Sequence, residues 1–372
     1  MRRQIDWLTA AGWTVDTVGV GDGQVRGVRR HYPIHPPRRW TLTPFGTVAL
    51  YLLSSRAMRF RRLVTDGIDR ALHEDIRRGV YDLFVFNDHH LMPWVKDRRV
   101  FTAAALAARI HADVHEYFPP RYSRRTWWAR ITGPHHDWVR SLIGDPMFTT
   151  RSVVVDEIAD LYESEFQIPR PEVIMSAPAF AELEPTPVHT PIRLVHHGKS
   201  ELTRGLVELV DAVGVLDDRF ELTMYLVGGE AVADALRERA RPFSDRVTIL
   251  PAVPYDDLCA TLNQHDVEVA FFPPTTKNLE LAMPNKLFEA IQARLGMIIG
   301  ETAPMVRIVE KYQVGGIARG WSADALADAL STITPEDVSR WKAATTHAAR
   351  DLNAEAEGRR FLQIIGGDGD EG

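Results

Sequence analysis

Over the second half of this 372-residue chain, short apolar segments alternate regularly with amphipathic ones. The apolar segments have the length and character of buried strands and cover residues 192–197, 221–227, 246–250, 267–272 and 297–299. Helical periodicity marks the segments between them, at residues 205–216, 231–240, 255–264 and 285–295. Strands that alternate with helices pair in parallel, because each parallel connection needs a crossover. The pattern therefore predicts an α/β fold with a doubly wound parallel sheet.

One segment of this half combines a helix start with charged side chains. Pro284 ends what precedes it, and we expect the side chain of Asn285 to cap the helix that follows. Lys286 and Glu289 lie in the first turns of that helix, and Gly296 is expected to close it. A helix N-terminus beside a cation attracts an anion, and a carboxylate accepts hydrogen bonds from sugar hydroxyls. The alternative from these residues alone is an ordinary capped helix with a surface Lys and Glu.

A second segment places a glycine turn with two cations at the end of a strand. The strand ends in Gly198, and Lys199 and Arg204 precede the helix that starts near Gly205. This layout is typical of a phosphate site at the carboxyl edge of a parallel sheet. Gly228 ends the next strand and is expected at the same edge. The glycine spacing fits neither the dinucleotide-binding pattern nor the P-loop, so neither site is indicated.

Together the two segments resemble the C-terminal, donor-binding domain of retaining glycosyltransferases of the GT-B fold, specifically glycosyltransferase family 4. In that family the first glycine loop ends in a basic residue followed by Gly, as Arg204-Gly205 does, and Pro-Asn-Lys-Leu-Phe-Glu matches Pro284 to Glu289. The family often has another glutamate eight positions earlier, where this chain has Leu281. The resemblance covers roughly residues 80–350. It implies two Rossmann-like domains that face each other across a cleft.

The resemblance also implies roles for individual residues. It assigns the nucleotide-diphosphate sugar to Gly198, Lys199, Arg204, Gly228, Pro284, Asn285, Lys286 and Glu289. The cations among them would stabilise the leaving diphosphate in place of a divalent ion, so neither a metal nor another cofactor is expected. On the acceptor side it points to residues after two expected strands, Asp88, His115 and Glu116. We predict as catalytic residues His115, Glu289, Lys199 and Arg204.

Residues 1–176 are expected to form the acceptor-binding Rossmann-like domain. Its expected elements are a helix at 2–11, strands at 13–20, 83–88 and 110–114, a Gly-, Pro- and Arg-rich loop at 21–39, and a helix at 40–62. A proline-rich linker at 177–191, the donor-binding domain at 192–345, and a C-terminal helix with a disordered tail at 346–372 follow. A Rossmann-like domain normally opens with a strand, whereas this one opens on a helix. We therefore expect the first sheet to lack its first strand and the domain to be incomplete at its N-terminus.

Charge is distributed unevenly along the chain. Residues 1–140 contain 23 Lys and Arg against 13 Asp and Glu, although the whole chain has a net charge of −6. Arginines alternate there with Trp40, Phe45, Trp127 and Trp128, a combination suited to docking on an anionic membrane surface. Nucleic-acid binding is the alternative for a basic surface, but no recognisable motif supports it. We therefore expect no nucleic acid as a partner.

The remaining composition favours a cytoplasmic protein. The single cysteine excludes an internal disulfide framework, and no apolar run reaches the ~20 residues needed to span a bilayer. The expected location is therefore the cytoplasm, peripherally on the inner face of the membrane. His135, His136 and Asp137 suggest a metal site, but adjacent histidines point apart on a helix, so none is predicted there.

The leading hypothesis is a retaining hexosyltransferase that moves a sugar from a nucleotide-diphosphate sugar to a lipid-linked or saccharide acceptor, in cell-envelope or in capsular or exopolysaccharide synthesis. One alternative is a nucleotide-sugar epimerase of the same fold, which would need neither a wide acceptor cleft nor a basic first domain. The other is a non-catalytic scaffold that binds sugar nucleotides or a partner transferase. The sequence names neither the donor sugar nor the acceptor.

Overall fold

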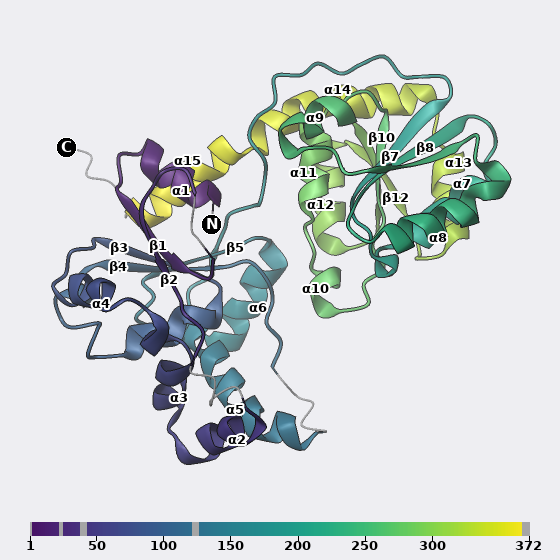
Figure 1. Ribbon diagram of the computed structural model, residues 1–372. Coiled ribbons are helices and arrows are strands. Elements are labelled where there is room, and N and C mark those ends of the chain that lie inside the picture. The colour runs from purple at the N-terminus through teal and green to yellow at the C-terminus, as the bar shows by residue number, and fades with distance from the viewer. Residues whose placement is uncertain (1, 22–24, 38–42, 121–125, 367–372) are drawn as a thin grey trace. The chain divides into compact units, whose positions relative to one another are not determined.

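The computed structural model describes residues 2–21, 25–37, 43–120 and 126–366, and the chain divides into two compact units (Figure 1). Unit 1 comprises Met1–Ile174 and Gly358–Gly372, and unit 2 comprises Met175–Glu357. The segment expected as a linker, 177–191, is therefore part of unit 2.

Unit 2 contains a six-stranded sheet in which every neighbouring pair is parallel. Its strands are β7 (Ile192–Lys199), β8 (Phe220–Val227), β9 (Val247–Pro251), β10 (Val267–Ala270), β11 (Gly296–Gly300) and β12 (Gly315–Ala318). The strand order is β12-β11-β10-β7-β8-β9, which confirms the doubly wound prediction. The direction of winding reverses between β7 and β10. In such sheets ligands bind outside the carboxyl ends of the strands at this switch point.

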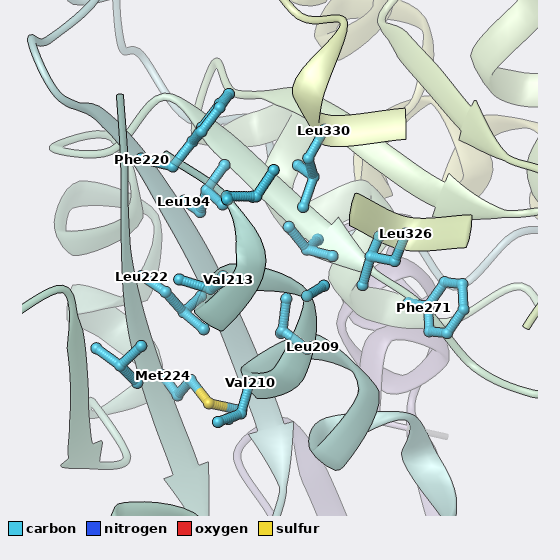
Figure 2. Close-up of a cluster of buried hydrophobic side chains, with 14 of the residues drawn as sticks. Leu194, Leu209, Val210, Val213, Phe220, Leu222, Met224, Phe271, Leu326 and Leu330 are labelled. Atoms are coloured by element: carbon cyan, nitrogen blue, oxygen red, sulfur yellow. The ribbon is translucent and has the colours of Figure 1, made fainter. Parts of the chain in front are cut away.

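Helices cover both faces of this sheet (Figure 1). One face packs against α7 (Leu206–Val215), α8 (Glu230–Ala240) and α13 (Ala323–Ser331), and the other against α9 (Leu258–Leu262), α11 (Asn285–Gln292), α12 (Ala303–Tyr312) and α14 (Pro335–Asp351). Successive strand residues point to opposite faces, so Leu194 joins the first core and Val195 the second. Burying such a side chain stabilises the fold by roughly 1.5–3 kcal/mol. The first core contains Leu194, Leu222 and Met224 from the strands, Leu209, Val210 and Val213 from α7, and Leu326 and Leu330 from α13 (Figure 2).

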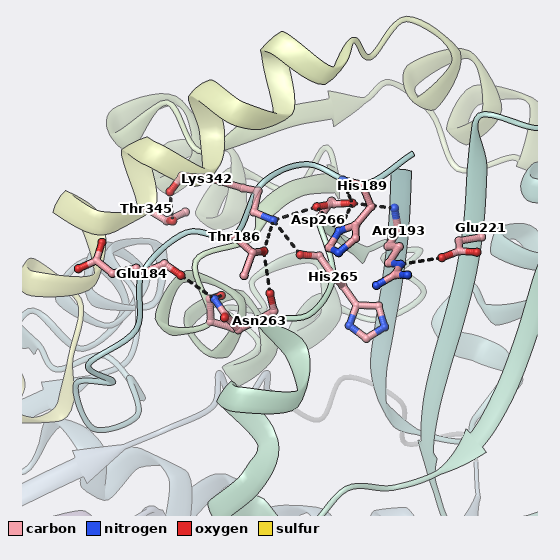
Figure 3. Close-up of polar contacts among 11 residues, drawn as sticks. Glu184, Thr186, His189, Arg193, Glu221, Asn263, His265, Asp266, Lys342 and Thr345 are labelled. Atoms are coloured by element: carbon pink, nitrogen blue, oxygen red, sulfur yellow. Dashed lines mark hydrogen bonds and ion pairs between the residues drawn. The ribbon is translucent and has the colours of Figure 1, made fainter. Parts of the chain in front are cut away.

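A buried ion pair fixes the opposite edge of the sheet, where the strands begin (Figure 3). Lys342 of α14 lies 2.9 Å from Asp266, which directly precedes β10. Its ammonium also donates to the Thr186 hydroxyl at 2.9 Å. Asp266 accepts in addition from the backbone N–H groups of His189 and Arg193. Segment 177–191 is thereby attached to unit 2 at the edge opposite the carboxyl ends of the strands.

The described residues of unit 1 form two parallel sheets. Strands β3 (Leu83–Asn87), β4 (Arg109–Val114), β5 (Thr150–Val153) and β6 (Glu172–Val173) form one, and β1 (Val15–Gly19) and β2 (Val28–Pro33) form the other. The prediction of a loop over residues 21–39 was therefore wrong for β2. Its arginines concealed the strand, because Arg29 is paired across the sheet with Asp16 of β1 while Tyr32 is buried.

The helices of unit 1 complete its fold (Figure 1). They are α1 (Arg2–Ala10), α2 (Pro44–Leu53), α3 (Arg56–Leu63), α4 (Arg70–Arg77), α5 (Trp127–Ser141), α6 (Asp156–Phe166) and α15 (Ala354–Gly366), the last of which begins in unit 2. The single helix predicted over 40–62 is broken in two, because the Ser55 side chain caps the N-terminus of α3. Trp40 lies outside the described residues.

Candidate functional site

The carboxyl edge of the unit 2 sheet presents helix N-termini that have no side-chain cap. Gly205, Gly229 and Pro284 occupy the N-cap positions of α7, α8 and α11, and none of them makes a side-chain capping hydrogen bond. Asn285 was predicted as the cap of α11, but it is the first helical residue and its side chain is exposed. The first N–H groups of these helices have no partner within the helix, so they favour an anion at this edge.

The end of α11 also differs from the prediction. Gly296 was expected to close the helix, but α11 ends at Gln292 and Gly296 is the first residue of β11. Arg294 adopts the left-handed conformation instead, with φ of 63°. Its buried guanidinium donates to the carbonyls of Ile291 and Gln292, the last turn of the helix. An arginine thus satisfies the terminal carbonyls where the sequence favoured a glycine.

Lys286, in the first turn of α11, is a buried cation at this edge of the sheet. Its exposed fraction is 7%. Its Nζ lies 3.1 Å from Nε2 of His196 on β7 and 4.6 Å from the centroid of the Phe272 ring. Because Nδ1 of His196 lies 2.9 Å from the Val269 carbonyl, that nitrogen carries the proton and Nε2 accepts from Lys286. Burial, with a smaller contribution from the charge of Arg204, lowers the pKa of Lys286 to about 8, although the carboxylates of Glu268 and Glu289 act to raise it.

Gly198 permits this position of the lysine. Its φ is +137°, and a Cβ built there would lie 3.2 Å from Nζ of Lys286. A side chain at residue 198 would therefore both strain the backbone and crowd the ammonium. The structure brings together Gly198 and Lys286, which the sequence analysis assigned to the same site from separate segments.

Glu289 belongs to a buried chain of charged groups. Its Oε2 lies 2.9 Å from Nε2 of His197 on β7, and Nδ1 of His197 lies 3.1 Å from Oε2 of Glu268 on β10. All three side chains are buried. Burial alone would lower the pKa of His197, but the charge of Glu268 and the hydrogen bonds to both carboxylates raise it to about 9. A histidinium thus holds Glu289 in a fixed orientation near the carboxyl edge of the sheet.

The other predicted donor-side residues line the same edge. Lys199 ends β7 and is exposed, and Gly228, with φ of 89°, follows β8. The loops after these strands are joined, because the backbone N–H of Ser200 donates to the Val227 carbonyl at 3.0 Å. Arg204 lies in the turn before α7 and pairs with Glu201 at 2.9 Å. That pair is partly exposed, so it restrains the guanidinium only weakly.

In unit 1, the predicted acceptor-side residues meet at the ends of β3 and β4. His115 Nε2 lies 2.6 Å from Oδ2 of the buried Asp113, and the backbone N–H of His115 donates to Oδ1 of Asp88 at 3.1 Å. Asp88 adopts φ of 60° and ψ of 172°, a strained conformation that places its carboxylate there. The hydrogen bond to Asp113 raises the pKa of His115 against the effect of burial. Glu116 is exposed, and its carbonyl accepts from Tyr162.

Sequence reasoning did not assign His196, His197 or Glu268 to the site. A detectable signal existed for Glu268, because a glutamate flanked by valines in an apolar strand needs a buried partner. The adjacent His196-His197 pair at the end of β7 was a second signal. Both histidines are buried and point to opposite faces of the sheet, one toward Lys286 and one toward the two glutamates.

His135, His136 and Asp137 lie on α5. His135 is buried, and burial lowers its pKa to about 4. Among the residues that the structure describes, no group of three or more His, Cys, Asp or Glu side chains is arranged to hold a metal ion.

Comparison with protein families matches residues 191–334 to the family described as Glycosyl transferases group 1. The matched segment extends from just before β7 to just beyond α13 and includes every donor-side residue named above. No curated protein matches the sequence.

Solved structures resemble the whole chain. A glycosyltransferase from Rickettsia africae ESF-5 is 14% identical with a TM-score of 0.65, over 98% of this chain and 92% of that one. Sucrose-phosphate synthase from Thermosynechococcus elongatus is 16% identical with a TM-score of 0.66, over 98% and 91%. A UDP-forming α,α-trehalose-phosphate synthase from Burkholderia xenovorans, solved with glucose-6-phosphate, is 13% identical with a TM-score of 0.59, over 95% and 91%. At these identities the likeness shows the fold.

Proposed function

We propose that the chain, whose residues 191–334 match the glycosyl transferases group 1 family, is a retaining, nucleotide-sugar-dependent glycosyltransferase and that it transfers a hexosyl group to a lipid-linked or saccharide acceptor. The proposed setting is the synthesis of a cell-envelope, capsular or exopolysaccharide. The observation that carries the proposal is the concentration of helix N-termini and cations at one strand switch point of unit 2.

The diphosphate of the donor is proposed to bind at that edge. Lys286 and Arg204 supply positive charge, and the uncapped start of α11 supplies N–H groups. Lys199 adds a further cation at the end of β7. A leaving nucleoside diphosphate gains negative charge as the bond from its oxygen to the sugar C1 breaks. These groups therefore stabilise the transition state more than the ground state.

The remaining residues are proposed to position the sugar and the acceptor. Glu289, oriented by His197, accepts hydrogen bonds from donor hydroxyls. The acceptor oxygen forms its bond to C1 on the face from which the diphosphate departs, and its proton passes to the leaving phosphate oxygen. Such a step needs no catalytic carboxylate pair. On the acceptor side, Asp88 and Asp113 fix His115 at the ends of β3 and β4.

A panel of labelled sugar nucleotides, offered with lipid-linked and saccharide acceptors in the presence of EDTA, tests this assignment. We expect a labelled glycosidic product with one donor, and about a hundredfold slower turnover in Arg204→Ala or Lys199→Ala. Arg340→Ala is the matched control, because Arg340 also makes an exposed pair with a carboxylate three residues away. Undiminished turnover in Arg204→Ala would remove the diphosphate assignment.

The same assay separates the alternatives. An epimerase converts the labelled sugar nucleotide without any acceptor, and a scaffold binds it without converting it. The acceptor-dependent product is expected because unit 1 has a built polar cluster of its own around His115, which neither alternative requires.

A group of exposed apolar side chains on unit 1 supports the proposal of a lipid-linked acceptor. Phe45, Leu52, Leu53, Met58 and Trp127 are exposed large apolar residues on α2, α3 and α5, which we call the apolar patch. Arg56 and Arg62 of α3 are exposed beside it. In the described part of the chain, no helix has both the length and the apolar character that crossing a bilayer requires. Apolar side chains flanked by arginines favour the surface of an anionic membrane.

Liposome flotation provides the test of this surface. We expect binding to anionic vesicles, weaker binding to neutral ones, and loss of binding as salt rises. The double variant Leu52→Ser/Leu53→Ser should reduce partitioning at least about tenfold, since burial of one leucine is worth roughly 1.5–3 kcal/mol. Val215→Ser, an equally exposed apolar residue on α7 of unit 2, should bind as wild type does. Equal flotation of the double variant would exclude the apolar patch as the contact.

A further inference from the structure

The two sheets of unit 1 have facing edges that pair with nothing described. β1 pairs with β2, and β3 pairs with β4, but no strand pairing joins β1 to β3. The two strands run in the same direction, because the start of both, at Thr14 and at Asp82, lines one pocket at their base. Each therefore presents alternate backbone N–H and C=O groups to the space between them. Unpaired edges of this kind are templates for another strand.

The space between the two strands is an apolar cavity of about 270 Å³. It follows β1 from Val15 to Val18 and β3 from Leu83 to Asn87. Figure 1 shows α1 on one face of this layer and α4 on the other. The cavity is lined from α1 by Ile5 and Leu8, from α4 by Leu72 and Ile76, and beyond β3 by Leu91 and Trp94.

Two buried acceptors at this cavity also have no donor. Oε1 of Gln4 and Oδ1 of Asn87 are buried and lack a hydrogen-bond partner within the described residues. Both residues line the cavity, and Gln4 is 6% exposed. An apolar ligand would leave these oxygens and both strand edges without donors. A backbone in extended conformation supplies donors and acceptors on both of its sides together with apolar side chains on both faces.

We propose that this cavity is a strand site, occupied by an extended apolar segment that pairs in parallel with β1 and β3 and leads into α1. The segment is inferred to lead into α1 because α1 lines the cavity and is followed in the chain by β1. A strand, α1 and β1 would form one crossover unit between neighbouring parallel strands. The occupied cavity would join the two small sheets of unit 1 into one continuous sheet.

The site has a consequence for the polar cluster at the strand ends. Gln4 Nε2, in the first turn of α1, donates to Oδ2 of Asp113 at 2.5 Å, and the same carboxylate oxygen holds His115. The loop from the added strand into α1 would therefore pass beside Asp113. Occupation of the cavity is expected to order the acceptor-side residues as well as the sheet.

The test compares the chain with two fusions placed before Arg2. One adds five Val and Ile residues and a short Gly-containing loop, and the other an equally long segment in which proline alternates with serine. The apolar fusion is expected to raise the Tm of unit 1 by on the order of 10 °C and to slow amide exchange in both β1 and β3. The proline fusion should do neither, since it lacks half of the N–H donors.

A blocking variant and a peptide keep the test decisive. Val85 lines the cavity, so Val85→Trp should fill it and abolish the effect of the apolar fusion. A synthetic peptide of the same five apolar residues with lysines at its ends, added to the unfused chain, should slow exchange of the same amides. Unchanged exchange in β1 and β3 with both the fusion and the peptide overturns the proposal. Equal stabilisation by the proline fusion overturns it also.

Discussion

Replacing Lys286 by methionine is expected to lower kcat by about two to three orders of magnitude while unit 2 stays folded. Methionine keeps an unbranched apolar stem against Phe272, where the lysine Nζ lies 4.6 Å from the ring centroid, but it removes the charge. The lost term is stabilisation of the leaving diphosphate, so kcat should fall more than the apparent affinity for the donor. Steady-state kinetics with the preferred donor measure both. An unchanged kcat would show that Lys286 serves packing alone.

The pKa of Lys286 gives this prediction a pH signature. Because burial lowers that pKa to about 8, the ammonium loses its proton as pH rises through that value in the free enzyme. We expect kcat/KM to decline above pH 8, and the residual activity of Lys286→Met to lack this decline. The negative diphosphate favours the charged lysine, so the corresponding decline in kcat should lie at higher pH. A profile of kcat/KM that is the same for both proteins would contradict this role.

Much of unit 2 was predictable from sequence because its pattern is local. Each strand is a short apolar run, and each helix carries a periodic apolar face, so type and order follow from the chain itself. The strand order of the sheet confirmed the doubly wound expectation. The termini of α11 were not predictable, because Pro284 occupies the cap position and buried Arg294 satisfies the carbonyls at the end. Both features depend on contacts that the sequence pattern does not contain.

Unit 1 shows the opposite case. β2 is rich in arginine, and its polar residues concealed the period of a strand. Arg29 is neutralised by Asp16 on the neighbouring strand, and Arg30 lies 4.4 Å over the ring of Tyr32. A cation that stacks or pairs within a sheet is compatible with a strand, but sequence alone cannot tell it from a solvated loop residue. The strand was identifiable only from its partners.

The candidate donor site was predicted in its outline and missed in its support. Gly198, Lys286 and Glu289 were chosen from two segments, and the structure places them at one edge of the unit 2 sheet. The histidines and Glu268, which hold Lys286 and Glu289 in place, were missed because they look like parts of apolar strands. Burial decides their charge state, and burial is a property of the fold. The catalytic roles of Lys199, Arg204, Glu289 and His115 stay predictions.

Replacing His197 by leucine is expected to destabilise unit 2 by about 3–5 kcal/mol. The histidinium lies between Glu268, which is fully buried, and Glu289, which is nearly so. Removing it leaves two carboxylates that face each other with no cation between them. Amide exchange in β7 and β10 measures the opening free energy of unit 2 separately from that of unit 1. A loss below about 1 kcal/mol would show that the chain of charges contributes little.

A double variant distinguishes lost pairing from lost packing. In His197→Leu/Glu268→Leu the deeper carboxylate is removed together with its partner, so Glu289 is the one carboxylate of the His197 chain that is left without the histidinium. The double variant should therefore be more stable than His197→Leu, although it contains one substitution more. If packing of the imidazole were the main contribution, the two losses would add and the double variant would be the less stable protein.

The pH dependence of stability gives the same charge chain a sign that can be checked. The folded-state pKa of His197 is raised from 6.5 to about 9, so the folded state binds more protons than the unfolded state between these values. The stabilisation that His197 contributes, on the order of 3 kcal/mol, is fully present below pH 6.5 and is lost as pH rises through 9.

Lys286 acts in the opposite sense at higher pH, because the cost of burying its charge is relieved between about pH 8 and 10.5. The double variant retains Lys286 but lacks the charge of Glu268, which raises the pKa of Lys286, so this relief begins at lower pH in the double variant and changes the stability difference in the same direction as His197 does. The stability difference between wild type and double variant should therefore shrink from pH 6 to pH 9. A constant difference over that range would mean that His197 is neutral in the folded protein, and Glu289 would then lack the cation that we propose orients it.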